Sequence, residues 1–470
     1  MTAQGSAASG GTGGRTLAAM QAIRARLESR ALGPGDRLPS IRGLARNLKL
    51  SPSTVVEAYD RLAAEGLIRA RPGSGFYVCA TKLPPLALAR DAPPADRAVD
   101  PFWVSRQSLD ADPEALKPGC GWLPSGWLPG EALRRTLRGL SRREEALLTD
   151  YGSTRGSAAL RRLLMGRFAE EGLEAAPDQL LLTASATQGL DLVCRLLLRP
   201  GDAVLVDDPC YFNFRALLRA HQARVVGVPY GPSGPDPADF EAVVLTERPR
   251  LYLTNSALHN PTGATLSAPH AHRLLKIAAA HGLLVVEDEA FADFEPEPSV
   301  RLALLDGLER VIRVGGFSKT LSASLRCGYV LARADWIAEL ADLQLATSFG
   351  GPSPAVAEAV ADLLSGGGHR RHVEALRRRL TRARREVSGR LRDLGVEPWI
   401  EPRGGFHLWG RLPEGGDSAA IARAALAEKV VFAPGDVFSL SRSAGGFMRF
   451  NVAQCEDARV YRVLGGLLRG

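Results

Sequence analysis

Short apolar segments of strand length recur along the chain beyond residue 123, and segments with helical periodicity separate most of them. The strand candidates are residues 180–183, 203–206, 224–228, 251–254, 283–287, 311–314 and 328–331. Strands that alternate with helices favour a parallel sheet, and strands that are apolar throughout are typical of a sheet buried on both faces. The pattern therefore predicts an α/β domain with a mostly parallel sheet that helices cover on both sides.

Polar and aromatic side chains follow the first two of these strands, at the carboxyl ends where open α/β sheets bind ligands. Ser185, Ala186 and Thr187 open a helix, whose backbone N–H groups and dipole attract a phosphate. An ordinary helix cap has the same residues, so both interpretations remain open here. Tyr211 can stack on a planar ring, although an isolated aromatic more often packs in a core.

Two later strand ends carry groups suited to a heteroaromatic ligand. Asn260, within His259-Asn260-Pro261-Thr262-Gly263, can hydrogen-bond a ring hydroxyl, although Asx-Pro turns without a function are common. Asp288 can keep a pyridine nitrogen protonated, which makes the ring an electron sink.

Lys319 lies in the apolar, glycine-rich segment 314–329, and Arg326 follows it by seven positions. Burial would favour the neutral amine, which condenses with an aldehyde to a Schiff base. The guanidinium of Arg326 is suited to a phosphate on the same molecule. A surface lysine that follows a strand would show the same local sequence.

The first eighty residues hold most of the basic excess of the chain. Eleven arginines and lysines stand against five acidic residues there, a net charge of +6 out of the +8 of the whole chain. Such a concentration indicates an electrostatic surface for nucleic acid. Apolar spacing and turn residues predict helices at 17–27, 41–48 and 51–65, followed by strands at 67–71 and 75–78.

This order of elements predicts a winged helix-turn-helix, whose third helix enters the major groove by its N-terminal end. Ser51, Ser53 and Thr54 lie at that end and are candidates for contacts with bases or phosphates. A small protein-interaction module is the alternative.

Two further features of this region suit DNA. Arg42, at the start of the second helix, is placed to bind a phosphate or a guanine edge. Gly73 and Gly75 would let the backbone of the wing approach the minor groove.

Composition divides the chain into four parts. Residues 1–14 are rich in Gly, Ser, Ala and Thr, and this composition predicts a disordered tail. Residues 15–80 form the predicted winged helix. Residues 81–120 contain prolines at 84, 85, 93, 94 and 101, which indicates either a spacer or a loop wrapped on the large domain. Residues 121–470 form the α/β domain.

Several classes of protein are disfavoured. The six cysteines are scattered singly without a CxxC pair, which argues against a disulfide framework or a zinc site and fits a reducing cytosol. We expect no metal site. The chain shows no apolar run of membrane-spanning length and no apolar signal core, so a cytoplasmic protein is expected.

The N-terminal motifs resemble a known family. The segment Pro34-Gly35-Asp36-Arg37-Leu38-Pro39-Ser40-Ile41-Arg42, followed by Ser51-Pro52-Ser53-Thr54-Val55, is similar to the DNA-binding domain of GntR-type bacterial regulators. The resemblance runs from about residue 17 to residue 78 and implies a double-stranded DNA operator as partner.

The order of the later motifs resembles the fold-type I pyridoxal-phosphate proteins of the aspartate aminotransferase class. The resemblance implies a smaller C-terminal α/β subdomain and pyridoxal 5'-phosphate as cofactor. Lys319 would form the internal aldimine, and Asp288 would contact the pyridine nitrogen. Asn260 would bind the phenolic oxygen, and Tyr211 would stack on the ring.

The same resemblance implies ligands at both ends of the cofactor. Arg449, within Met448-Arg449-Phe450-Asn451, would grip the α-carboxylate of a substrate or effector, unless it forms a surface ion pair. The implied phosphate ligands are Ser185, Ala186, Thr187, Arg326 and Tyr151 of the partner subunit, and Ser318 is a further implied cofactor contact.

The chain departs from the pattern of this class at two places. Gly316 stands where the class often has a serine, which removes one phosphate ligand. Ala290 and Phe291 stand where a tyrosine usually follows the strand-end aspartate, and the loss of its hydroxyl should affect turnover more than cofactor binding.

Together the two halves resemble the MocR subfamily of GntR-type regulators. That resemblance implies a homodimer, arranged head-to-tail, in the bacterial cytoplasm and on the nucleoid when bound to DNA. The large domain would sense pyridoxal phosphate or an amino compound. The alternative is an aminotransferase with an appended DNA-binding domain, and residual transaminase activity is compatible with both.

Overall fold

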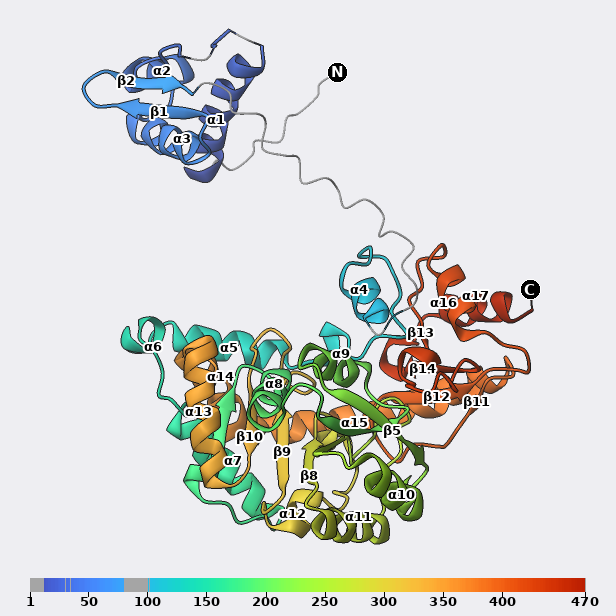
Figure 1. The fold of residues 1–470 in the computed structure, drawn as a ribbon. Coiled ribbons are helices and arrows are strands. Elements are labelled where there is room, and N and C mark those ends of the chain that lie inside the picture. Colours follow the sequence, from blue (N-terminus) through green and yellow to red (C-terminus); the bar gives the residue numbers. More distant parts are fainter. Residues whose placement is uncertain (1–11, 30, 34, 80–99, 101, 470) are drawn as a thin grey trace. The chain divides into compact units, whose positions relative to one another are not determined.

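The computed structural model describes residues 12–29, 31–33, 35–79, 100 and 102–469 (Figure 1). It divides into two compact units, Met1–Arg97 and Ala98–Gly470. Within the described ranges, no helix combines the length and the apolar content that crossing a lipid bilayer requires.

The N-terminal unit contains three helices and a hairpin, as predicted. Its elements are α1 (Thr12–Glu28), α2 (Ile41–Leu48), α3 (Pro52–Ala64), β1 (Ile68–Arg71) and β2 (Gly75–Val78). Ser40 and Ser51 cap α2 and α3, because their hydroxyls accept hydrogen bonds from the N–H groups of Gly43 and Thr54. The strands pair antiparallel, with Ile68 opposite Val78, and form the wing.

The tail predicted over residues 1–14 extends too far. Residues 1–11 lie outside the described residues, whereas Thr12 to Gly14 belong to α1. Ala19 and Ile23 of α1 are fully buried in the core of this unit. Tertiary packing of this kind supports helix ends that composition alone disfavours.

The large unit is built on an eight-stranded sheet of order β3-β10-β9-β8-β7-β4-β5-β6. All seven predicted strands are present, and the additional β6 forms an edge. The bounds are β3 Leu180–Thr183, β4 Ala203–Asp208, β5 Arg224–Gly231, β6 Gly234–Pro235, β7 Leu251–Thr254, β8 Leu284–Asp288, β9 Val311–Gly316 and β10 Gly328–Leu331. The five strands from β9 to β5 run parallel, whereas β10 is antiparallel to both of its neighbours.

Helices cover both faces of this sheet, which confirms the predicted α/β class. One face packs against α8 (Ala186–Leu197), α9 (Phe212–Ala220) and α13 (Ala334–Ser348). The other packs against α7 (Ala158–Glu170), α10 (Pro237–Glu247), α11 (Ala268–His281), α12 (Leu302–Asp306) and α14 (Pro354–Ser365). Two further helices, α5 (Gly130–Leu140) and α6 (Ala146–Thr149), contact α14.

A smaller C-terminal subdomain contains an antiparallel sheet of order β11-β12-β14-β13. Its strands are β11 (Glu397–Pro398), β12 (His407–Arg411), β13 (Ala433–Pro434) and β14 (Phe447–Asn451). Its helices are α15 (Gly367–Arg392), α16 (Ser418–Ala425) and α17 (Ala458–Arg469), which share one hydrophobic core with the sheet.

The C-terminal part of the predicted linker 81–120 belongs to this subdomain. Residues 80–99 and 101 lie outside the described residues, but α4 (Trp103–Leu109) buries Trp103 and Val104 in the subdomain core. The N–H of Leu116 also donates to the carbonyl of Lys429 at 2.9 Å. Apolar burial and backbone pairing therefore hold the described part of this segment on the subdomain, whereas its proline content had left a spacer and a wrapped loop both open.

Candidate cofactor-binding site

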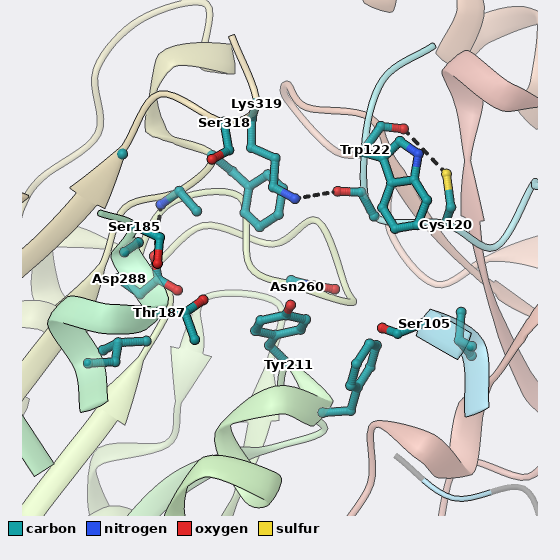
Figure 2. Close-up of a pocket in the computed structure, with 18 of the residues that line it drawn as sticks. Ser105, Cys120, Trp122, Ser185, Thr187, Tyr211, Asn260, Asp288, Ser318 and Lys319 are labelled. Carbon is teal, nitrogen blue, oxygen red and sulfur yellow. Dashed lines mark hydrogen bonds between the residues drawn. The ribbon is translucent and has the colours of Figure 1, made fainter. Parts of the chain in front are cut away.

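A cavity of about 220 Å³ lies at the carboxyl ends of β8 and β9, beside the N-terminus of α8 (Figure 2). It gathers side chains that follow five different strands, as the parallel topology predicts. The predicted residues that line it are Ser185, Ala186, Thr187, Tyr211, Asn260, Asp288, Ser318, Lys319, Arg326 and Arg449.

Lys319 presents its amine to this cavity. Its Nζ donates a hydrogen bond to the carbonyl of Gly121 at 2.6 Å (Figure 2). Burial lowers the pKa of Lys319 to about 8, and the positive charge of Arg449 adds to this effect while Asp288 opposes it. The amine is therefore easier to deprotonate than that of an exposed lysine.

Asp288 ends β8 and is only 5% exposed. Its Oδ1 accepts a hydrogen bond from the N–H of Ala290 at 3.0 Å, and its backbone carbonyl accepts one from Asn255 Nδ2 at 3.0 Å. Burial raises the pKa of Asp288 to about 6. These hydrogen bonds fix the orientation of the carboxyl. A positively charged partner in the cavity would stabilise its ionised form.

The start of α8 forms an anion-binding end of the cavity. Ser185 caps the helix, with its Oγ accepting from the N–H of Gln188 at 3.0 Å. The first N–H groups of a helix have no partner within it and carry the positive end of its dipole. Arg326 lines the same cavity. Gly328 lets β10 approach closely, because a Cβ there would lie 2.6 Å from the backbone nitrogen of Ala186.

Arg449 lies on β14 and is 1% exposed, so it is not the surface ion pair that was the alternative. Its Nη1 donates to Asn260 Oδ1 at 2.7 Å, and its Nη2 donates to the carbonyl of Gly119 at 2.6 Å. Burial lowers the pKa of Arg449 to about 10. Its buried Nε has no hydrogen-bond partner among the described residues, which leaves a donor for a bound anion.

Tyr151 does not line the cavity of its own chain. Its side chain is 81% exposed, and its ring contacts Phe349 edge-on with 4.8 Å between the ring centroids. The expectation that Tyr151 reaches the cofactor of a partner subunit stays a prediction.

Sequence reasoning missed one wall of the cavity. This wall consists of Val104 and Ser105 from α4 and of Cys120, Gly121 and Trp122. A signal was present in Gly119-Cys120-Gly121, since paired glycines often mark a close approach of the backbone. At Gly119 a Cβ would lie 2.4 Å from the backbone nitrogen of Ala433.

Residues 316 and 291, where the sequence departs from the pattern of the pyridoxal-phosphate class, lie in the cavity wall. Gly316 ends β9 and lines the cavity. Phe291 is 5% exposed, and the centroid of its ring lies 5.8 Å from Lys319 Nζ. An aromatic ring therefore occupies the neighbourhood of the lysine without contributing a hydroxyl.

The N-terminal unit exposes most of the predicted DNA contacts. Arg42, Ser51 and Ser53 are exposed, and Gly73 and Gly75 adopt positive φ angles of 71° and 104° in the wing. These angles favour glycine and let the turn form without strain.

Thr54 was predicted to contact DNA, but the structure buries its side chain. It is 7% exposed, and its Oγ1 lies 2.7 Å from Ser51 Oγ in a hydrogen bond. Thr54 therefore belongs to the cap and core of α3 rather than to the exposed surface.

The fold and the cavity define the large unit as a domain of the fold-type I pyridoxal-phosphate class. Residues 123–467 match the model of "Aminotransferase class I and II", and residues 15–78 match that of "Bacterial regulatory proteins, gntR family". The chain belongs to the aminotransferase class I and II family and, through its fusion to a GntR domain, to the MocR subfamily of transcriptional regulators.

Three similar proteins illustrate this assignment. The HTH-type transcriptional regulator TauR of Rhodobacter capsulatus is 32% identical over 92% of this chain and 91% of its own. The probable rhizopine catabolism regulatory protein MocR of Rhizobium meliloti is 29% identical over 88% of this chain and 84% of its own. The crystal structure of LysN, an alpha-aminoadipate aminotransferase from Thermus thermophilus complexed with N-(5'-phosphopyridoxyl)-L-leucine, gives a TM-score of 0.70 at 29% identity and covers 78% of this chain and 95% of its own.

The family indicates pyridoxal 5'-phosphate as cofactor, and the cavity fits that molecule. A helix N-terminus and Arg326 suit its phosphate, and the buried carboxyl of Asp288 suits a protonated ring nitrogen. Because Arg449 engages the amide oxygen of Asn260, the amide nitrogen of Asn260 is the group suited to a ring oxygen.

Proposed function

We propose that this chain is a DNA-binding transcriptional regulator whose aminotransferase-like domain senses pyridoxal phosphate or an amino compound. The observation that carries the proposal is the convergence of Lys319, Asp288, Arg326 and Arg449 on one cavity, in a chain that also bears a winged helix. The regulator acts in the bacterial cytoplasm, on chromosomal DNA.

Each residue has a defined task in this proposal. When bound, pyridoxal phosphate supplies an aldehyde for amines and an electron-withdrawing ring. Lys319 provides the amine that holds the aldehyde, and its lowered pKa makes the neutral form accessible. Asp288 accepts the ring N–H, and Tyr211 covers one face of the ring.

The phosphate and carboxylate ends are held by different groups. Ser185, Ala186, Thr187, Ser318 and Arg326 hold the phosphate, with Tyr151 of the partner subunit completing the set in a head-to-tail homodimer. Arg449 binds the carboxylate of an amino effector, and its bonds to Asn260 and Gly119 fix the guanidinium before the effector arrives.

An effector shifts DNA binding only if its affinity differs between two arrangements of the protein. Lys319 would hold the aldehyde of the bound cofactor, and the amine of an effector would compete with it for that group. A free Lys319 side chain has the carbonyl of Gly121 as its hydrogen-bond partner. Gly121 belongs to the same cavity wall as Cys120, Trp122 and the α4 residues, so a change in the partner of Lys319 would alter contacts on that side of the cavity.

The second candidate is a working aminotransferase with an appended DNA-binding unit. The buried, preorganised Arg449 favours it, because carboxylate binding serves catalysis as well as sensing. Phe291 disfavours it, because no hydroxyl stands beside Lys319 at that position. Conversion of an amino acid to its keto acid by the purified protein, at rates that support metabolism, would establish this second function.

The deciding experiment measures binding of the full-length protein to the region upstream of its own gene, with and without added pyridoxal phosphate. Specific binding that changes with the cofactor supports a regulator that senses it. Specific binding that ignores the cofactor directs the search to amino acids and other amines, tested in the same assay. If no specific site is found there or in a genome-wide binding experiment, the regulator is contradicted.

A further inference from the structure

Helix α15, drawn in orange in Figure 1, concentrates positive charge on the large unit. Its 26 residues contain ten arginines and two glutamates, a net charge of +8. The formal net charge of the whole chain has the same value. The helix is therefore a second basic region, far in sequence from the winged helix.

The arginines are not spread evenly around α15. The helix packs Leu376, Leu380, Val387 and Leu391 into the core of the C-terminal subdomain. Arg371, Arg378, Arg382 and Arg385 are exposed on the opposite face, and we call these four residues the arginine stripe. At 100° and 1.5 Å per residue they fall within an arc of about 60° and extend over about 21 Å of the axis.

Most other arginines on the surface of α15 have acidic partners. Arg370 pairs with Glu374 at 3.4 Å, Arg379 with Glu456 at 3.2 Å, and Arg390 with Glu386 at 2.6 Å. Arg392 pairs with two acidic residues, Glu397 at 3.6 Å and Glu401. Among the described residues, the four members of the arginine stripe have no ion-pair or hydrogen-bond partner.

A stripe of this kind is unfavourable in the isolated helix. Arg378 and Arg382 are four residues apart, and Arg382 and Arg385 are three apart, so like charges face each other along the surface. An ordinary solvated helix face mixes both signs. Packing does not require these arginines, because the core uses the opposite face of α15. A linear polyanion would relieve the repulsion.

We propose that the arginine stripe of α15 binds the phosphate backbone of DNA next to the site held by the winged helix. The inference rests on the proposed function, which already brings the chain to DNA. Guanidinium groups bind phosphate through paired N–H donors, and such contacts add affinity without reading sequence. When one of two DNA-binding surfaces in a chain has bound, the effective concentration of the other surface near the DNA is raised.

DNA is favoured over other polyanions by two features. The stripe is straight and about 21 Å long, and a duplex presents one negative charge per about 1.7 Å of axis along such a length. The chain also carries a domain that matches the gntR family, so the same polypeptide that bears the stripe is brought to DNA.

The test uses the full-length, cofactor-loaded protein and the triple variant R378Q/R382Q/R385Q. Binding to a long mixed-sequence DNA duplex is measured by fluorescence anisotropy over a range of KCl concentrations. The plot of log affinity against log salt should become shallower by about 2 to 3 units, because each phosphate contact contributes about 0.9. Glutamine retains helix propensity, and an unchanged cofactor spectrum and melting temperature verify the fold.

The matched control is R219Q/R273Q/K276Q, which removes three positive charges from exposed positions on α9 and α11. Its salt dependence should stay at the wild-type value. Equal slopes for the two triple variants would overturn the stripe as a DNA contact.

The remaining outcomes separate this inference from the proposed function. If wild type binds DNA and Arg42→Ala weakens it while the stripe variant keeps the wild-type slope, the stripe is overturned and the regulator stands. If wild type does not bind DNA at any salt concentration, both fail. A stripe variant that loses only binding to phosphatidylglycerol vesicles, or only self-association, assigns the surface to a membrane or to a second copy and overturns the proposal.

Discussion

Lys319 and Asp288 show how burial shifts the pKa of single residues in this cavity. At pH 7 a lysine of pKa about 8 is about 9% neutral, whereas one with the ordinary value of 10.5 is about 0.03% neutral. Asp288, with its pKa raised to about 6, is still mostly ionised at that pH. The two shifts therefore leave a carboxylate for the ring nitrogen and a usable fraction of free amine in the same cavity.

We expect Lys319→Ala to abolish the absorption band of the lysine-bound cofactor while the fold is retained. The removed side chain makes one hydrogen bond, to the carbonyl of Gly121, so its loss should barely change the melting temperature. The measurement is the visible spectrum after addition of pyridoxal phosphate, with circular dichroism for the fold. Lys276→Ala on the exposed face of α11 is the control, and a band that persists in the Lys319 variant would refute the assignment.

The pKa of Lys319 also predicts a pH dependence. The neutral amine is the reactive form, so the rate at which cofactor-free protein captures pyridoxal phosphate should rise about tenfold per pH unit below pH about 8 and level off above it. Stopped-flow absorbance measures this capture rate between pH about 6 and about 9.5. The same measurement with a free amine in place of the protein corrects for the ionisation of the cofactor itself. A midpoint near the ordinary pKa of a lysine would show that burial does not lower the pKa of the Lys319 amine.

At the scale of elements, α2 and α3 position the proposed DNA contacts. Capping by Ser40 and Ser51 fixes where each helix begins, and so determines which side chains stand at the exposed ends. Thr54 illustrates the consequence: the hydrogen bond to Ser51 and the first turn of α3 turn its side chain inward. Ser51 and Ser53 remain exposed at the same helix end.

Arg42→Ala should weaken DNA binding by about 1–3 kcal/mol if the guanidinium contacts a guanine edge, and less if it contacts only a phosphate. The cofactor spectrum should not change, because Arg42 is exposed on α2 of the N-terminal unit. Anisotropy titrations with the upstream region of the gene measure the effect. Arg61→Ala serves as control, since Arg61 pairs with Glu57 near the other end of α3, and equal affinities for both variants would contradict the proposed docking.

At the scale of the whole molecule, the large unit exposes an aromatic pair. Tyr151 and Phe349 are 81% and 66% exposed and contact each other. Large exposed aromatics that cluster often mark an interface. This fits the expectation that Tyr151 serves the cofactor site of a partner subunit.

We expect Phe349→Asn to weaken the proposed homodimer and, with it, the affinity for pyridoxal phosphate. Phe349 ends α13 with a positive φ of 54°, a conformation that asparagine tolerates, so the helix end should survive. Sedimentation measures the dimer, and equilibrium titration measures the cofactor. Leu245→Asn, at an exposed position of α10, is the control, and a dimer of unchanged stability would place the interface elsewhere.

Much of the fold and of the site was predictable from local sequence. The seven strands of the large sheet and helix α2 appear where apolar patterning and capping residues placed them. The residues that follow β3, β4, β7, β8 and β9 converge because parallel strands direct their carboxyl ends to one edge. The chemistry of the cavity was thus readable from short motifs and their order.

By itself, the sequence determined most of the secondary structure, the two kinds of domain and the residues that line the cavity after the strand ends, because these depend on periodicity and local chemistry. Only the tertiary structure decided which distant groups meet. Asn260 and Arg449 are 189 residues apart, and Lys319 and Gly121 are 198 apart, yet each pair is hydrogen-bonded. Contacts over such separations follow from the packing of whole elements, as does the burial of α4 in a segment whose prolines left a spacer and a wrapped loop both open. Local patterns carry no information about that packing.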